Sequence, residues 1–213
     1  MHGSLSQVLD YSWDYVTSLF WARYPNPYAS SHVLHEDVLE RLLIDDHTLY
    51  TKRIIVKRGF GKIPFWLRKL LANRKELIVE ESIIDLGKRE ILTRTRNFGG
   101  LARYAVVLTE DCRYVPMLRD PSSTQIDRYF VLQSSLGVKI LHPLWSFLKR
   151  RYTNSAQRSL QGYRFICQQF AGQLDSHPNA VLSPSKIACR LKDFALNKRP
   201  RLLLAQAGSK NSD

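Results

Sequence analysis

The sequence predicts an α+β fold in which an antiparallel sheet of about seven strands wraps against one long C-terminal helix. Segments with strand character follow one another from residue 33 to residue 136, and turn signals such as DDH, DLGK, NFGG and RDPSS separate them. Such short connections favour antiparallel pairing. From about residue 141 to 171, apolar residues recur three and four positions apart, which indicates a helix. A sheet that curves strongly would leave a cavity between itself and this helix.

The N-terminal part is predicted to hold a strand, a helix and a rigid turn. The stretch GSLSQVLDY is typical of a short strand. Ser12 is a suitable N-cap for a helix over about 12–23, whose apolar residues have helical spacing. This helix must end before Pro25, because the residue before a proline is disfavoured in helical geometry. The segment YPNP then forms a rigid turn over 24–30.

Six further strands and a tail complete the predicted organisation. The strands are expected at 33–44, 48–58, 75–85, 89–97, 104–115 and 125–136. The segment GFGKIPFWLRKLLANRK, which precedes the strand at 75–85, is both apolar and basic, and it is too irregular for a strand. Residues from about 172 onward are polar and basic and include three prolines. We therefore expect a folded domain over 1–171 and a poorly ordered basic tail over 172–213.

The composition points to an anionic partner. The net charge of +13 and the pI of about 9.9 predict attraction to nucleic acid, to an anionic membrane surface or to an anionic ligand inside the protein. Three cysteines without a CxxC spacing make a disulfide framework or a cysteine metal site improbable. The N-terminus has neither a signal-peptide core nor the arginines of a transit peptide, so we expect no conventional cleavable presequence.

The sequence lacks the patterns of an enzyme. HVLHED contains two histidines and two carboxylates, but residues three apart on a strand point to opposite faces, so no metal site is expected. GFGKIP begins like a phosphate loop and lacks its Gly-Lys-Ser/Thr ending, and no GxSxG elbow is present. We expect no catalytic residues, no metal and no cofactor.

Several basic residues share a face with apolar ones. Alternation along LYTKRIIVKRG places Arg53 and Lys57 on the same face as Leu49 and Ile55. They are either solvated charges on an exposed face or cations placed for an anionic head group. On the C-terminal helix, Arg151, Ser155 and Arg158 lie at the margin of the apolar stripe. They either cover the core with their stems or complete a phosphate site from the helix side.

The segment KIPFWLRKLL also has two interpretations. It is either a short helix that packs on the core or a mobile lid that touches an anionic membrane. The lid would use Lys62, Ile63, Phe65, Trp66 and Leu67. A third class of function, a basic nucleic-acid-binding module, has the net charge and the run NKRPR in its favour.

Five motifs in a fixed order resemble the PRELI-like family. They are RYPNPY, SHVLHEDVLER, TKRIIVKRG with GKIPFW, EESIIDLGKREILTRTRN and LTEDCRY. The resemblance covers about residues 1–170 and is greatest to the branch that transfers phosphatidic acid. It implies a curved seven-stranded sheet around a long helix, with a lipid tunnel and an Ω-loop lid, as in START and phosphatidylinositol-transfer proteins.

The resemblance also implies a function and partners. Members carry phosphatidic acid from the outer to the inner mitochondrial membrane for cardiolipin synthesis, and a sister branch carries phosphatidylserine. They reside in the mitochondrial intermembrane space, bind the anionic, cardiolipin-containing membrane surface peripherally, and pair with a small twin-CX9C helical-hairpin protein. The implied role is therefore a non-enzymatic lipid carrier, with a phosphatidylserine carrier or a scaffold that has lost transfer as alternatives.

The family's head-group residues map onto positions of this chain. They match Arg23, His32, Arg53, Lys57, Arg151 and Arg158, while Lys62 and its neighbours match the lid. The family often has asparagine where this chain has Ser155, which bears on head-group selectivity.

Overall fold

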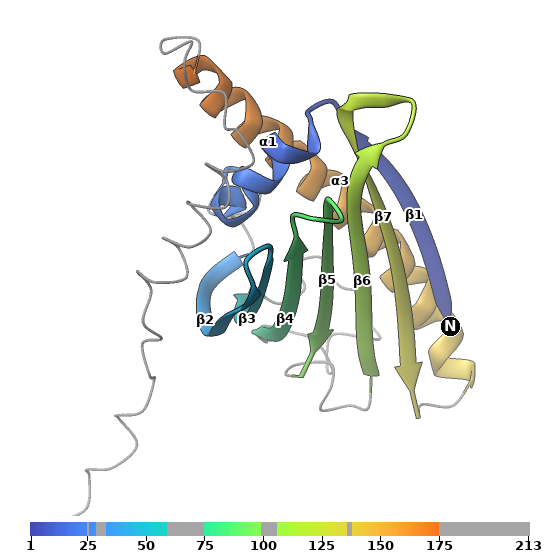
Figure 1. Ribbon diagram of the computed structural model, residues 1–213. Coiled ribbons are helices and arrows are strands. Elements are labelled where there is room, and N and C mark those ends of the chain that lie inside the picture. The colour runs from blue at the N-terminus through green and yellow to red at the C-terminus, as the bar shows by residue number, and fades with distance from the viewer. Residues whose placement is uncertain (25, 29–32, 59–74, 99–105, 136–137, 175–213) are drawn as a thin grey trace, which may run out of the picture.

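The computed structural model describes residues 1–24, 26–28, 33–58, 75–98, 106–135 and 138–174 (Figure 1). The described strands are β1 (His2–Leu9), β2 (Val33–Asp45), β3 (Thr48–Lys57), β4 (Glu76–Asp85), β5 (Glu90–Asn97), β6 (Val106–Met117) and β7 (Asp120–Ser134). The described helices are α1 (Trp13–Ser18), the 3₁₀ turn η1 (Phe20–Arg23) and α3 (Val138–Leu174).

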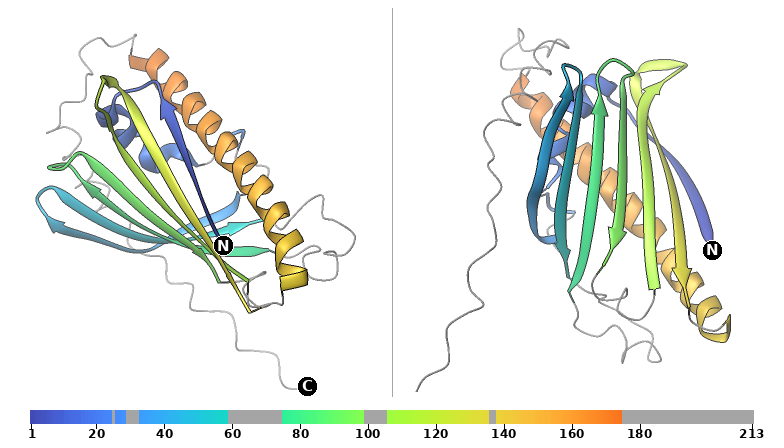
Figure 2. Two further views of the ribbon diagram at one scale, coloured as in Figure 1. Left: turned by 90° about the vertical axis from the view of Figure 1, so that its right-hand side faces the viewer. Right: turned by 60° about the horizontal axis from the view of Figure 1, so that its bottom comes forward.

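The seven strands form one antiparallel sheet in the order β1-β7-β6-β5-β4-β3-β2. Consecutive strands from β2 to β7 are hydrogen-bonded neighbours, as the short turns predict, and β1 closes onto β7 at the other edge. Helix α3 crosses one face of the curved sheet, and α1 lies near the C-terminal half of α3 (Figure 2). We call the face toward α3 the inner face. The predicted α+β class is confirmed.

The helix predicted over 12–23 is divided in the structure, which corrects that prediction. The α1 helix begins as expected, with the Ser12 hydroxyl accepting a hydrogen bond from the Tyr15 amide at 3.4 Å. Leu19 then leaves helical geometry, with φ −101° and ψ 1°, and the chain continues as η1. Tyr24 is extended before Pro25, as the proline requires. The tighter 3₁₀ turn ends the segment with Arg23 buried.

The hydrophobic core lies between the inner face and the two helices. It contains Leu9, Trp13, Val16, Phe20, Leu49, Ile84, Ile91, Tyr114, Ile126, Tyr163 and Ile166. Two side-chain hydrogen bonds link α1 to its neighbours: the Trp13 indole N–H donates to the Tyr114 carbonyl at 3.1 Å, and the Tyr15 hydroxyl donates to the Cys167 carbonyl at 2.9 Å. These hydrogen bonds hold α1 against β6 and α3. No helix among the described residues is long and apolar enough to span a membrane.

Candidate functional site

Arg23 is held in place by the YPNP corner. The Asn26 side-chain amide donates to the Arg23 carbonyl at 2.5 Å, and the Asn26 side-chain oxygen accepts from the Tyr28 amide at 2.9 Å. Asn26 is buried and lies close to Gly162 of α3, where a Cβ atom would come within 2.8 Å of the Asn26 amide group. The corner and the helix therefore fix the backbone from which the Arg23 side chain extends.

Arg23 meets Arg53 at a single carboxylate on the inner face. Arg53 of β3 and Glu80 of β4 are register partners. Glu80 Oε1 accepts from Arg23 Nη2 at 2.5 Å and from Arg53 Nε at 2.8 Å, and Arg53 Nη2 lies 2.7 Å away. Their side chains are only 8%, 3% and 6% exposed, in the order Arg23, Arg53, Glu80. We call these three residues the arginine cluster.

Aromatic rings surround the two guanidinium groups. The Arg23 guanidinium carbon is 4.2 Å from the centre of the Phe20 ring. The Arg53 guanidinium carbon is 5.4 Å from Trp21 and 5.6 Å from Tyr24. The electron-rich faces of such rings stabilise a cation that has lost part of its hydration. The sequence WARYP therefore supplies both a cation and the aromatic surroundings for a second one.

The electrostatics of the cluster leave a surplus of positive charge. Burial raises the pKa of Glu80, but the two arginines and Lys57 outweigh burial, so the pKa lies below its ordinary value. Burial opposes the charge of Arg23, and Glu80 more than compensates, so the pKa of Arg23 is raised. Two guanidinium groups thus face one carboxylate in a buried setting, where a charge needs compensation.

A second carboxylate, Glu36 of β2, compensates the one positive charge that Glu80 leaves in the cluster. Its Oε2 atom accepts from Arg53 Nη1 at 2.9 Å. The Glu36 side chain is 32% exposed, so it reaches the cluster from the rim of the inner face. The sequence motif HVLHED indicates Glu36 only as a possible metal ligand, and no motif singles out Glu80. Strand alternation could have found Glu80, because it shares the inner face with Ser82 and Ile84.

Three buried donors near the cluster have neither a hydrogen-bond acceptor nor an ion-pair partner among the described residues. They are Trp21 Nε1, Arg23 Nε and the Tyr163 hydroxyl. Trp21 lies under Arg53, and Tyr163 lies near enough to Arg23 to affect its pKa. A buried donor without an acceptor costs roughly 1–3 kcal/mol, so such groups are usually satisfied by water or a ligand. This arrangement is suited to the oxygen atoms of an anion.

Arg41 adds a further cation on this side of the sheet, and sequence reasoning did not single it out. Its Nε atom donates to the Thr51 hydroxyl at 3.2 Å, and its guanidinium carbon is 4.8 Å from the Trp21 ring centre. Burial, and secondly the charge of Arg53, lower the pKa of Arg41. The inner face near β2 and β3 is therefore rich in positive charge.

The predicted site residues are only partly brought together. The structure unites Arg23 and Arg53, with Lys57 half-buried and close enough to Glu80 to lower its pKa. On α3, burial and then Arg158 lower the pKa of Arg151, so these two arginines lie near each other.

The helix residues do not join the arginine cluster. Ser155 and Arg158 are exposed, and within the described residues the partners of Glu80 do not include Arg151, Ser155 or Arg158. His32 and the lid residues Lys62, Ile63, Phe65, Trp66 and Leu67 lie outside the described residues.

A second buried ion pair lies further along the inner face. Arg128 Nη1 of β7 donates to Glu110 Oε1 of β6 at 2.8 Å, and the Tyr152 hydroxyl of α3 donates to the same oxygen at 2.9 Å. Burial raises the pKa of Glu110, but Arg128 and three hydrogen bonds hold it below its ordinary value. Here one cation and one carboxylate balance, and Tyr152 joins the sheet to the long helix.

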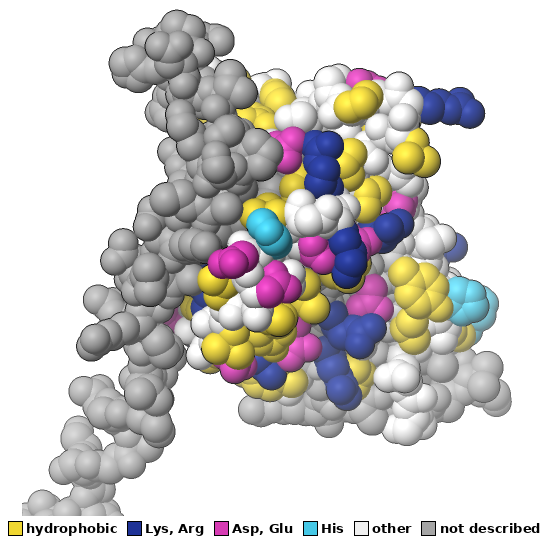
Figure 3. Space-filling view, in the orientation of Figure 1, with side chains coloured by type: hydrophobic (Ala, Val, Ile, Leu, Met, Phe, Trp, Pro, Cys, Tyr) yellow, Lys and Arg dark blue, Asp and Glu magenta, His cyan; other side chains and the backbone are white. Residues whose placement is uncertain are grey.

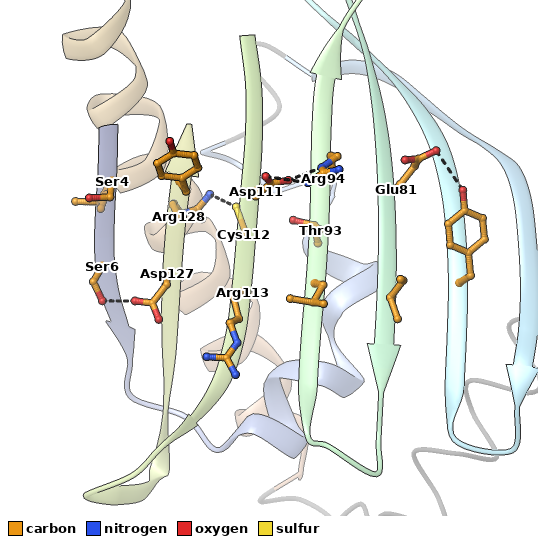
Figure 4. Close-up of a pocket in the computed structure, with 15 residues that line it drawn as sticks. Ser4, Ser6, Glu81, Thr93, Arg94, Asp111, Cys112, Arg113, Asp127 and Arg128 are labelled. Atoms are coloured by element: carbon orange, nitrogen blue, oxygen red, sulfur yellow. Dashed lines mark hydrogen bonds and ion pairs between the residues drawn. The ribbon is translucent and has the colours of Figure 1, made fainter. Parts of the chain in front are cut away.

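The outer face carries a hollow of about 860 Å³, lined by residues such as Tyr50, Ile83, Leu92 and Tyr129. Figure 4 views this face, with α3 behind the strands. Charged side chains on this face form ion pairs: Arg94 Nε lies 2.7 Å from Asp111, and Lys52 lies 3.0 Å from Glu81.

Figure 3 shows basic and acidic side chains interspersed over this face. The surplus of buried positive charge is therefore on the inner face.

The predicted lipid tunnel between the sheet and the helix stays a prediction.

Among the described residues, no group of three histidine, cysteine or acidic side chains could hold a metal ion. The described cysteines are not activated: burial raises the pKa of Cys112, as it does that of Cys167 to about 12. The two buried guanidinium groups of the arginine cluster are suited to binding an anion.

The model of the PRELI-like family matches residues 14–173, and the chain belongs to this family. The Ups1 homolog of Schizosaccharomyces pombe is 34% identical over 161 residues, which are 76% of this chain and 91% of that protein. The human mitochondrial PRELI domain-containing protein 1 is 34% identical over 173 residues, 79% of this chain and 76% of that protein. The Saccharomyces cerevisiae mitochondrial protein UPS1 is 28% identical over 155 residues, 72% of this chain and 85% of that protein. The resemblance inferred from the five motifs is confirmed, and the predicted mitochondrial location agrees with these names.

Two solved structures share the fold. The Thermus thermophilus protein TTHA0849 has a TM-score of 0.54 and 13% identity, and covers 79% of this chain and 98% of its own. The Zhui aromatase/cyclase of Streptomyces sp. R1128 has a TM-score of 0.53 and 12% identity, and covers 79% of this chain and 94% of its own. At these identities the likeness shows the fold alone, a curved antiparallel sheet with a long C-terminal helix.

Proposed function

We propose that this protein carries phosphatidic acid between the outer and inner mitochondrial membranes, without changing it chemically, and so supplies cardiolipin synthesis. One observation supports this most: the inner face sets four cations, Arg23, Arg41, Arg53 and Lys57, against the two carboxylates Glu80 and Glu36, beside buried donors that lack an acceptor among the described residues. A phosphate monoester carries more negative charge than a zwitterionic head group, so it compensates such a cluster best. Membership of the PRELI-like family adds independent support.

The proposal includes a setting for this activity. The carrier would act in the intermembrane space, as a heterodimer with a small twin-CX9C helical-hairpin protein, and would touch the anionic membrane peripherally through the predicted lid. The activity is assigned to the domain predicted over residues 1–171, since the family match covers 14–173. The basic tail proposed over 172–213 overlaps the last residues of α3, which ends at Leu174.

Phosphatidylserine is a second candidate cargo, and Glu36 is the observation in its favour. A partly exposed carboxylate beside Arg53 can pair with the serine ammonium while Arg53 binds the phosphate. Glu36 would attract the ammonium group of phosphatidylserine, whereas it would repel the phosphate of phosphatidic acid.

A transfer assay between liposomes tests both candidates. The purified full chain, together with the helical-hairpin partner, is mixed with donor vesicles that contain fluorescent phosphatidic acid, phosphatidylserine or phosphatidylcholine. The expected result is fastest transfer for phosphatidic acid. Transfer of phosphatidic acid no faster than the protein-free blank would overturn the proposal, and faster transfer of phosphatidylserine would favour the second candidate.

A further inference from the structure

The two carboxylates that pair with Arg53, those of Glu80 and Glu36, differ in burial and in the number of cations that they compensate. Glu80 is 6% exposed and accepts hydrogen bonds from both buried arginines. Glu36 is 32% exposed, comes from the edge strand β2, and its carboxylate pairs with Arg53. Loss of Glu80 would leave two buried cations without their shared partner. Loss of Glu36 would free one guanidinium nitrogen near the rim.

The Glu36 carboxylate has the chemistry of the anion that the site is suited to bind. It places a negatively charged oxygen 2.9 Å from Arg53 Nη1. A phosphate oxygen would form the same kind of charge-assisted hydrogen bond at the same nitrogen. The register places Glu36 opposite Ile55, between Arg53 and Lys57 on the same face of β3. An anion that approaches Arg53 and Lys57 from the rim therefore meets Glu36 first.

We propose that Glu36 is an internal substitute for the lipid head group, which neutralises Arg53 in the empty protein and is displaced when an anionic head group binds. This inference rests on the proposed function. The carboxylate lowers the affinity for every anionic head group, because the head group must compete with it for Arg53. In return, it keeps the buried cation compensated after the lipid has left, which favours release at the acceptor membrane.

Competition by Glu36 also sharpens selectivity. A dianionic phosphate monoester gains enough from Arg53 and the neighbouring cations to displace the carboxylate. A zwitterionic phosphodiester carries one negative charge on the phosphate and gains less, so the same competition excludes it more strongly. Glu36 would thus be a specificity-determining residue. The arginines attract every anionic head group, and Glu36 competes with those that bind weakly.

The test compares Glu36→Gln with the wild type and with Glu81→Gln, using the full chain. Glu81 is a matched control because it is also a partly exposed strand carboxylate paired with a cation, Lys52, but on the outer face. Binding of dioctanoyl phosphatidic acid and dioctanoyl phosphatidylcholine is measured by calorimetry. We expect Glu36→Gln to bind phosphatidic acid about fivefold to tenfold more tightly, the size of one partly exposed charged hydrogen bond, with a smaller gain for phosphatidylcholine. Glu81→Gln should match the wild type.

The outcomes separate this inference from the proposed function. Equal or weaker binding of phosphatidic acid by Glu36→Gln, with a wild type that binds it, overturns the role of Glu36 and leaves the carrier function intact. Failure of both proteins to bind phosphatidic acid, with unchanged thermal unfolding, overturns the proposed function and this inference together. Binding by the variant alone would contradict the proposed function, because the wild-type protein would then be unable to take up phosphatidic acid.

Discussion

At the scale of single residues, Glu80 is the group on which the arginine cluster depends. It compensates two guanidinium groups that are 8% exposed or less. We predict that Glu80→Gln lowers the free energy of unfolding by roughly 3–5 kcal/mol, because removal of one partner leaves buried charges uncompensated. Urea unfolding at neutral pH measures this, with Glu81→Gln as the control, for which a change within about 1 kcal/mol is expected. Equal effects of the two substitutions would mean that the cluster is hydrated and contributes little.

The same carboxylates set a pH dependence. The pKa values of Glu80 and Glu110 lie below their ordinary value of 4.5, because arginines stabilise the charged forms. The folded state therefore binds protons less readily than the unfolded state, so these groups stabilise the protein above pH 4.5. This stabilisation is lost as the pH falls below 4.5 through the folded-state values.

Unfolding measured between about pH 6 and pH 3 should show a steep decline in stability below the ordinary glutamate pKa of 4.5. The decline should be shallower in Glu110→Gln, which lacks one of the two groups. A wild-type stability that does not change over this range would contradict the assignment of both carboxylates.

At the scale of elements, the contact between the YPNP corner and α3 positions Arg23. A Cβ atom at Gly162 would come within 2.8 Å of the Asn26 amide group, whose hydrogen bond to the Arg23 carbonyl fixes the corner. Gly→Ala inside a helix ordinarily stabilises by about 1 kcal/mol. At this position we predict the opposite sign, with a lower melting temperature and weaker binding of phosphatidic acid.

Gln157→Ala, at an exposed position of the same helix, is the control and should leave both quantities nearly unchanged. A rise in melting temperature for Gly162→Ala with unchanged lipid binding would show that the corner tolerates displacement.

The elements themselves were largely predictable, for physical reasons. Alternation within strands and the turns DDH and DLGK depend on local chemistry, so the strand order along the chain and the long helix followed from the sequence. The division of 12–23 into α1 and η1 could not be predicted, because apolar spacing is similar for both helix types. The identity of Leu19 does not indicate that its backbone leaves α-helical geometry. The pairing of Arg53 with Glu80 could not be predicted either, because alternation assigns faces but not register partners.

At the scale of the whole molecule, charge is segregated by depth. The outer face mixes both signs in exposed pairs such as Arg94 with Asp111, which contribute at most about 1 kcal/mol each. The inner face holds buried cations in excess near β2 and β3 and a balanced pair near β6 and β7. Strand alternation left two interpretations open for Arg53 and Lys57, solvated charges or inward cations, and the structure shows Arg53 buried on the inner face. Which carboxylates pair with these cations could not be predicted from the sequence, since the pairing depends on which strands lie side by side.

The central claim, that the arginine cluster binds the lipid phosphate, is tested most directly by phosphatidic acid transfer in Arg53→Gln and Arg94→Gln. Both substitutions remove one paired strand arginine, one on the inner face and one on the outer face. We expect transfer by Arg53→Gln to be at least about tenfold slower than by the wild type, and transfer by Arg94→Gln to be unchanged. Wild-type transfer rates in a folded Arg53→Gln protein would contradict the account.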